Sequence, residues 1–380
     1  PTTTTPVYLS RRGHHHYNGS AWVNEGILHE SEARTNLLSY SGAVTSTGWN
    51  VSALNVSAVT AGSPFGSYQS ASPPSTASTE GQAYQIGKPL TSGATYVAWS
   101  LAKYSAGNGW FSVSHYNAGG VGGGNQRGWF DLQNGVVGSK DTTIIDHGMI
   151  DYGEGWWLCW ASKNAESTSG GINLGVTTGD GVFQGRNSGD VILIAGSQFE
   201  QGATPSSYIP TGSSSVTRAA ETLTVPAANL PYNSTNMSIQ MDGKMTYADR
   251  NLIREVQFVE WLADANNGIE QFACSGTGFF PNGAVAFFQE AAATTSLRVT
   301  PAATLPFGVN VPFNISSRHG STFINGAVGG TALTTDTTPT ALPNLSSTNL
   351  NLGQAFMGTI GQYRMWDEDI TDAGITEAST

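Results

Sequence analysis

Residues 96–135 read YVAWSLAKYSAGNGWFSVSHYNAGGVGGGNQRGWFDLQNG. Three runs rich in aromatic and aliphatic residues, at 96–101, 110–116 and 129–132, are separated by clusters of glycine and asparagine. Short runs of this kind, bounded by turn-forming residues, are typical of β-strands. The dipeptide Asn134-Gly135 closes the stretch and favours the tight turn of a β-hairpin. The stretch therefore predicts successive antiparallel strands.

The same pattern extends in both directions. Strand-like runs alternate with clusters of Gly, Ser, Asn and Pro from residue 37 onward, and Asn282-Gly283 and Asn325-Gly326 mark two more candidate hairpins. Glycine contributes 47 residues and only 11% of the chain is charged, so the residues that build long helices are scarce. One short helical turn is expected within 367–378. We predict an all-β protein made of two jelly-roll β-sandwiches in tandem.

Composition also divides the chain into four parts. Residues 1–36 form a Thr-, Arg- and His-rich arm, 37–210 the first sandwich and 222–380 the second sandwich. A Pro, Thr, Gly and Ser cluster at residues 209–215 marks the linker between them, 211–221. The arm has no periodicity and little apolar content, and such a segment stays disordered unless something holds it. We expect it to be held by another subunit or by another part of its own chain.

Charge and cysteine usage exclude several classes of protein. The chain has 16 Lys and Arg against 27 Asp and Glu, a net charge of −11, which argues against nucleic-acid binding. No run approaches the ~18 apolar residues of a spanning helix, so we expect no membrane insertion. Pro1–Pro6 lacks a signal-peptide pattern and would suit a chain whose initiator Met was removed. Cys159 and Cys274 lie in apolar contexts of different predicted domains, which favours buried free thiols.

Three groups of segments in the first half resemble a carbohydrate-binding-module-like jelly roll of tailed-bacteriophage structural proteins. They are Glu25–Leu38 (EGILHESEARTNLL), Trp129–Gly138 with Gly155–Cys159, and Gly196–Thr211 running on to Thr217–Ala220. They correspond in order to the opening, the hairpin with its following strand, and the closing segment of that domain. Trp157-Leu158 stands where the family often carries Tyr-Arg. The resemblance implies that residues 25–220 form a jelly roll of a virion protein.

The second half is similar to concanavalin A-like and laminin-G-like sandwiches over residues 222–376. The supporting segments are Ser321–Gly326, Asn349–Gly353 and Met357–Ile370. Laminin-G-like domains sometimes bind Ca²⁺ through loop oxygens, so the resemblance leaves Ca²⁺ open, although no EF-hand type of loop is present. We otherwise expect no cofactor.

The sequence contains few candidate residues for catalysis or for metal binding. Glycanases of the concanavalin-like fold place carboxylates on alternate residues of one strand, and their Glu-x-Asp-x-(x)-Glu pattern is absent here. The cluster Asp367–Asp369 with Asp372 suits the solvated start of a helix. His14–His16 lack Cys or further His at ligand spacing, so a metal bound on the axis of a trimer stays an alternative beside Ca²⁺. We predict no catalytic residue and no metal site.

Aromatic residues are the candidates for glycan binding, because their faces pack against sugar rings as against other apolar surface. Most of the tryptophans in Trp156–Trp160 are expected in the core, because strand alternation must bury at least one face. Aromatic residues near Gly- and Asn-rich loops are better ligand candidates. We name Trp110, Tyr116 and Tyr68.

Together these observations predict a non-enzymatic virion structural protein of a tailed bacteriophage, assembled in the host cytoplasm and displayed on the particle surface. It would be a tail fibre or spike component or a capsid decoration protein. Its arm would anchor it to other virion proteins, and it would form a homo-oligomer such as a trimer and bind a host-surface glycan. The alternatives are a secreted glycan-binding or glycan-degrading module, and a cement protein without a ligand.

Overall fold

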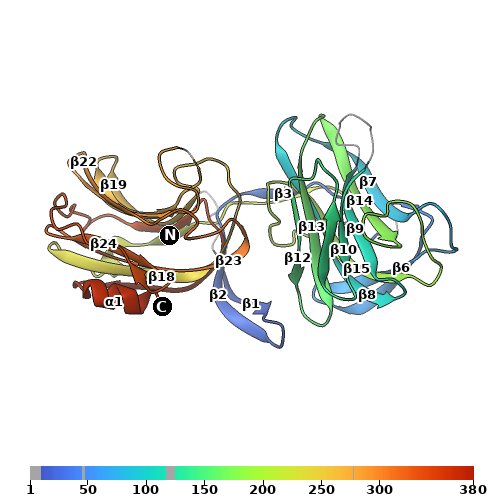
Figure 1. Cartoon of the computed structure of the whole chain (residues 1–380), viewed down its shortest axis with the longest axis horizontal. Coiled ribbons are helices and arrows are strands. Elements are labelled where there is room, and N and C mark those ends of the chain that lie inside the picture. The colour runs from blue at the N-terminus through green and yellow to red at the C-terminus, as the bar shows by residue number, and fades with distance from the viewer. Residues whose placement is uncertain (1–9, 45–47, 117–124, 277) are drawn as a thin grey trace. The chain divides into compact units, whose positions relative to one another are not determined.

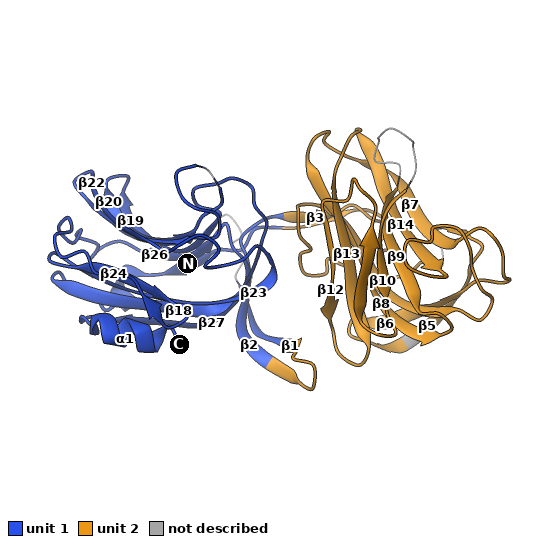
Figure 2. Ribbon diagram, viewed as in Figure 1, with its two compact units in different colours: residues 1–15, 24–33, 219–380 blue, residues 16–23, 34–218 orange. Residues whose placement is uncertain are grey.

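The computed structural model describes residues 10–44, 48–116, 125–276 and 278–380, and divides the chain into two compact units. Unit 1 comprises residues 1–15, 24–33 and 219–380, and unit 2 comprises residues 16–23 and 34–218 (Figure 2). Each unit is built of antiparallel sheets (Figure 1), so the all-β prediction with two sandwiches is confirmed.

Unit 2 contains two six-stranded sheets, with the strand orders β11-β10-β9-β14-β7-β4 and β12-β13-β8-β15-β6-β5, and a small pair of β16 with β3. The strands are β3 (Arg34–Asn36), β4 (Asn50–Ser52), β5 (Asn55–Ser63), β6 (Gly66–Ser72), β7 (Gly81–Pro89), β8 (Thr95–Ala106), β9 (Trp110–Tyr116), β10 (Gln126–Asp131), β11 (Val136–Lys140), β12 (Asp146–Asp151), β13 (Trp156–Asn164), β14 (Ser169–Thr177), β15 (Val191–Gln201) and β16 (Val216–Arg218).

The core of unit 2 lies between its two six-stranded sheets. Phe111 and Val113 of β9 and Leu174 of β14 pack with Cys159 and Phe199 of the other sheet, and all five are buried. Because side chains alternate across a strand, the residues between these core positions point to the opposite face of the first sheet. The predicted hairpin around residues 134–135 is confirmed, since β10 and β11 pair across it.

Unit 1 is also a sandwich, with sheets ordered β1-β2-β27-β18-β23-β24-β25 and β17-β26-β19-β20-β21-β22. Its elements are β1 (Arg11–Tyr17), β2 (Trp22–Glu30), β17 (Leu223–Val225), the 3-10 helix η1 (Ala227–Asn229), β18 (Asn236–Tyr247), β19 (Val256–Asp264), β20 (Asn267–Ala273), β21 (Val285–Ala291), β22 (Thr294–Val299), β23 (Gly308–Gly320), β24 (Ile324–Val328), β25 (Thr331–Ala332), β26 (Leu350–Gln354), β27 (Met357–Trp366) and α1 (Thr371–Ala378). The helix expected near the end of the chain is confirmed, and α1 packs on β23 and β24 (Figure 1).

The N-terminal residues expected to form an arm contain two strands that belong to a sheet of unit 1. Residues 1–9 lie outside the described residues, but β1 and β2 belong to the first sheet of unit 1, where β2 pairs with β27 from Ile27 opposite Ile360 to Glu30 opposite Met357. Arg11 ion-pairs with the buried Glu30 and with Glu221. Backbone pairing and these ion pairs hold the segment to its own chain, which is one of the two alternatives that the sequence left open.

Two further expectations change. The predicted linker contains β16, which pairs with β3, so only its last residues connect the units in sequence. Asn325-Gly326 does not form a turn, because both residues lie inside β24. Gly326 is required there because a Cβ would meet the ring of Phe287 at 2.1 Å. The thiols of Cys159 and Cys274 are free and buried, as expected.

Candidate functional site

The outward side of the first sheet of unit 2 carries an unusual density of polar residues. Cross-strand register forms one row of Arg127, Ser114, Asn173 and Tyr84 and a second of Trp129, Ser112, Gly175 and Gln82. We call this surface, with Trp110 and Tyr116 at the two ends of β9, the polar face. Ser112, Ser114 and Asn173 on the two central strands form its floor and are completely buried, while Gln82 and Tyr84 of β7 are half-buried.

A buried ion pair occupies the centre of the polar face. Nη2 of Arg127 donates to Oε1 of Glu80 at 2.6 Å, and both side chains are about 8% exposed. Nδ2 of Asn173 donates to Oε1 of Gln82 at 2.8 Å and lies 3.5 Å from Oε1 of Glu80. Burial raises the pKa of Glu80 by more than the neighbouring guanidinium and its hydrogen bonds lower it. The pair therefore ties β7 to β10 across the two strands between them.

Several buried polar atoms on the polar face have no hydrogen-bond partner among the described residues. They are Oε2 of Glu80, Oγ of Ser112, Oγ of Ser114, Oδ1 of Asn173 and Nε of Arg127. Buried polar groups are nearly always paired with protein, water or a ligand. Four of the five atoms are oxygens, so the floor of the face is suited to partners that donate hydrogen bonds, as water and hydroxyl groups do.

Aromatic rings with partial exposure flank this polar centre. Tyr84 and Tyr116 stack with their ring centroids 5.1 Å apart and their planes 10° apart, and both are half-buried. Trp110 is half-buried at the other end of β9. Phe183 is 52% exposed, with its ring centroid 5.5 Å from the guanidinium carbon of Arg127. The polar face therefore combines hydrogen-bonding groups with apolar rings at its rim.

The structure brings together two of the three aromatic residues named from the sequence. Trp110 and Tyr116 are six positions apart on β9, which puts them on the same face of the sheet. Tyr68 lies on β6 of the other sheet, where its ring packs edge-on against Trp156 with centroids 5.6 Å apart. Sequence reasoning missed the ion pair of Glu80 with Arg127, although serine alternating with core residues along 111–114 already indicated a polar side of the sheet.

The acidic cluster at the end of the chain and the histidines of the arm have structural contacts. Arg318 donates to both carboxylate oxygens of Asp369 at 2.7 Å and to Oδ1 of Asp372 at 2.8 Å, which fixes the start of α1 against β23. His15 lies in β1, with Nδ1 2.8 Å from the carbonyl of Gly13. Within the described ranges, no group of three or more His, Cys, Asp or Glu side chains is arranged to hold a metal ion.

A carboxylate pair that the sequence analysis did not anticipate lies in unit 1. Glu260 of β19 stands directly opposite Glu270 of β20, and Nε2 of Gln257 donates to both, at 3.4 and 2.7 Å. Arg254 donates hydrogen bonds to both carboxylate oxygens of Glu270. The side-chain amides of Asn351 and Gln354 on β26 donate to Glu260. The sequence analysis looked for carboxylates on alternate residues of one strand and missed this pair, because its two members lie on neighbouring strands. All four carboxylate oxygens of the pair accept hydrogen bonds.

Comparison with protein-family models and with curated proteins finds no match. Among solved structures, the chain is similar to a leech intramolecular trans-sialidase at 15% identity and a TM-score of 0.30, over 39% of this chain and 23% of that one. It is similar to domains LG4-5 of the mouse laminin α1 chain at 11% identity and a TM-score of 0.26, over 74% of this chain and 85% of that one. It is also similar to a tandem pair of CBM22 domains from Paenibacillus barcinonensis at 11% identity and a TM-score of 0.27, over 89% of this chain and 98% of that one. Likenesses this distant show nothing about what this chain binds.

No helix in the described part of the chain is long and apolar enough to cross a membrane.

Proposed function

We propose that the chain is a non-enzymatic surface protein whose unit 2 binds a glycan through the polar face. The observation that supports this most directly is the combination of partly exposed rings, Trp110 at one end and stacked Tyr84 and Tyr116 at the other, with polar groups between them. Aromatic rings offer apolar area for the faces of sugar rings, while a few placed polar groups give orientation.

The buried ion pair has a positioning role in this proposal. Glu80 and Arg127 bridge the floor, and Gln82 is held through Asn173 while remaining half-buried. A sugar ring resting on Tyr84 or Tyr116 would have Gln82 as its nearest accessible amide along β7. The rigid sheet and the buried network fix these groups before a ligand arrives, which lowers the entropic cost of binding.

The test is a glycan array followed by titration of the best ligand with the full chain. Trp110→Ala and Tyr116→Ala are expected to weaken binding at least about tenfold, the effect of removing a central interface residue. Trp22→Ala is the matched control, because Trp22 is an exposed tryptophan of β2, a strand that does not belong to the sheet of the polar face. Unchanged affinity in both polar-face variants, with their fold intact by circular dichroism, would refute the proposal.

We further propose that this adhesion protein is displayed on a tailed-bacteriophage particle as a homo-oligomer. The ordered resemblance of residues 25–220 to phage structural proteins and the weakly charged, Gly-rich composition support this. Anchoring to other virion proteins is tested best by deleting residues 1–9, which leaves β1 and β2 in place. Immunogold imaging of phage particles should then show loss of the truncated chain. Labelling at normal density would place the anchor elsewhere.

Glycan cleavage is the second candidate function, favoured by the opposed Glu260 and Glu270. Paired carboxylates ~5–10 Å apart are what glycoside hydrolysis requires. All four oxygens of the pair already accept hydrogen bonds from side chains of the protein, so we place binding first. Release of reducing ends from a bound glycan, abolished by Glu260→Gln and by Glu270→Gln, would reverse this order.

A further inference from the structure

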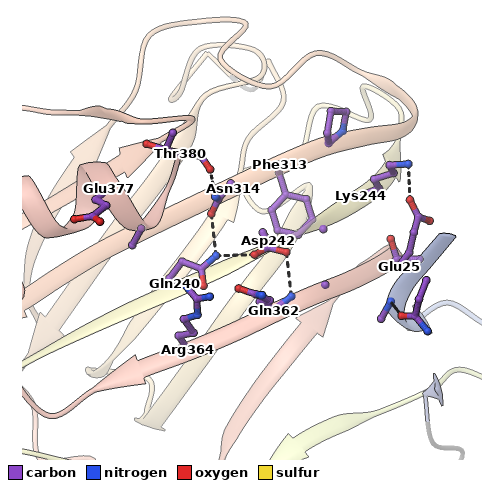
Figure 3. A pocket seen from close by; sticks show the side chains of 17 residues that line it. Glu25, Gln240, Asp242, Lys244, Phe313, Asn314, Gln362, Arg364, Glu377 and Thr380 are labelled. Atoms are coloured by element: carbon purple, nitrogen blue, oxygen red, sulfur yellow. Dashed lines mark hydrogen bonds and ion pairs between the residues drawn. The ribbon is translucent and has the colours of Figure 1, made fainter. Parts of the chain in front are cut away.

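A polar depression lies in unit 1, on the outer side of the sheet that contains β2, β27, β18 and β23 (Figure 3). Its volume is about 660 Å³, within the range of small-molecule sites. Register places Gln240 opposite Arg364, and Asp242 between Gln362 and Asn314. The β2 strand closes one side, and the end of α1 closes another.

Hydrogen bonds preorganise the floor of this depression. Nε2 of Gln240 donates to Oδ2 of Asp242 and to Oδ1 of Asn314, both at 2.9 Å. Oδ1 of Asp242 accepts from the backbone N–H of Gln362 at 3.0 Å. Lys244 ion-pairs with Glu25 of β2 at the edge. Figure 3 shows Gln240 between Asp242 and Asn314, with Lys244 turned toward Glu25. The floor is therefore held in one arrangement without a ligand.

Two buried atoms in this lining have no hydrogen-bond partner among the described residues. Oε1 of Gln240, on a side chain only 1% exposed, is an acceptor, and Oγ of Thr359 can donate or accept. The exposed guanidinium of Arg364 has no ion-pair partner in the described ranges, and it adds donors beside Gln240. The depression thus offers unused acceptors and unused donors side by side.

The charges of the lining narrow the class of ligand. Glu25, Asp242 and Glu377 outnumber Lys244 and Arg364, so the depression is not suited to an anion. The one aromatic side chain in the lining is buried in the core, so a ligand that depends on ring stacking is disfavoured too. Hydroxyl groups both donate and accept, and they match the mixture of amides, carboxylates and guanidinium found here.

We propose that this depression is a second binding site, which takes a neutral, hydroxyl-rich ligand such as one residue of a neutral saccharide. Gln240 and Thr359 receive its hydroxyl groups in the floor, and Arg364 contacts it at the rim. The site differs in chemistry from the polar face of unit 2, which has partly exposed rings. It does not depend on glycan binding by unit 2, and it would give each chain two points of attachment.

The experiment uses the isotope-labelled full chain and methyl glycosides of neutral hexoses as probes, with sulfate and acetate as anionic probes. Chemical-shift changes are expected in β18 and β27 with the glycosides, and they should saturate. Arg364→Ala and Gln240→Met should each weaken this binding at least fivefold. Arg12→Ala, an exposed arginine of β1 outside the depression, is the matched control and should leave binding unchanged.

The variants also separate this inference from the proposed function of unit 2. Trp110→Ala should abolish changes in unit 2 and leave those of β18 and β27 intact. The inference is overturned if no glycoside produces saturable changes in unit 1, or if Arg364→Ala and Gln240→Met bind as well as the wild type. It is also overturned if sulfate or acetate displaces the glycosides, because the depression would then be an anion site.

Discussion

Acid should destabilise unit 1 in part through the buried His319. His319 is completely buried, with Nε2 2.9 Å from Oγ of Ser317 and Nδ1 3.2 Å from Oε1 of Gln289. Burial lowers the pKa of His319 to about 3, against 6.5 in an unfolded chain. Between these values the unfolded state binds a proton that the folded state does not, so the free energy of unfolding falls as pH falls.

The size of the effect follows from the shift. One pKa unit corresponds to about 1.4 kcal/mol, so lowering the pH from 6.5 to 4 should cost unit 1 about 3 kcal/mol through this group. His319→Gln removes the titration and keeps a side chain able to hydrogen-bond with Ser317. The variant should be less stable than the wild type at pH 7, and the difference should shift in its favour by about 3 kcal/mol at pH 4.

Urea unfolding read by pulsed hydrogen exchange and mass spectrometry reports the two units separately. The matched control is His115→Gln in unit 2, because burial lowers the pKa of His115 to about 4. That variant should change the pH dependence of unit 2 alone. A constant difference between wild type and His319→Gln from pH 7 to pH 4 would refute the reasoning, since it would mean that His319 does not titrate below its usual range when folded.

Three further outcomes follow from the structure. Deleting residues 11–30 should unfold unit 1 or lower its free energy of unfolding by several kcal/mol, because β27 loses β2, one of its two neighbouring strands. Hydrogen exchange in β27 would report this, and unchanged protection would contradict the pairing. Gly326→Ala should lower the free energy of unfolding by about 1–3 kcal/mol, because its Cβ would overlap the ring of Phe287, and urea unfolding at neutral pH measures it. Cys159 and Cys274 should not react with a thiol reagent at pH 8 in the folded chain, because burial raises the pKa of both thiols. The pKa of Cys274 rises to about 12. Rapid labelling without denaturant would contradict this prediction.

Local patterns in the sequence were enough for the class of fold and for part of the candidate site. Alternation of Phe111 and Val113 with Ser112 and Ser114 determines which side of β9 faces the apolar core, because side chains on a strand alternate between its faces. The same period puts Trp110 and Tyr116 on one face. The turn at 134–135 also follows from local chemistry, since Asn-Gly adopts the positive φ angles of a tight hairpin turn.

Only the tertiary structure decided which distant segments pair. Residues 27–30 of β2 pair with β27, more than 300 residues later, and no local pattern identifies that partner. Asn325-Gly326 lies in a strand rather than a turn because β24 pairs with β23, and glycine at 326 leaves room for the ring of Phe287. Tyr68 is separated from Trp110 because β6 joins the other sheet, and Glu80 meets Arg127 only where β7 and β10 lie in one sheet. Strand alternation depends on each residue's immediate neighbours, whereas strand order depends on contacts between distant parts of the chain, and these contacts build the sites.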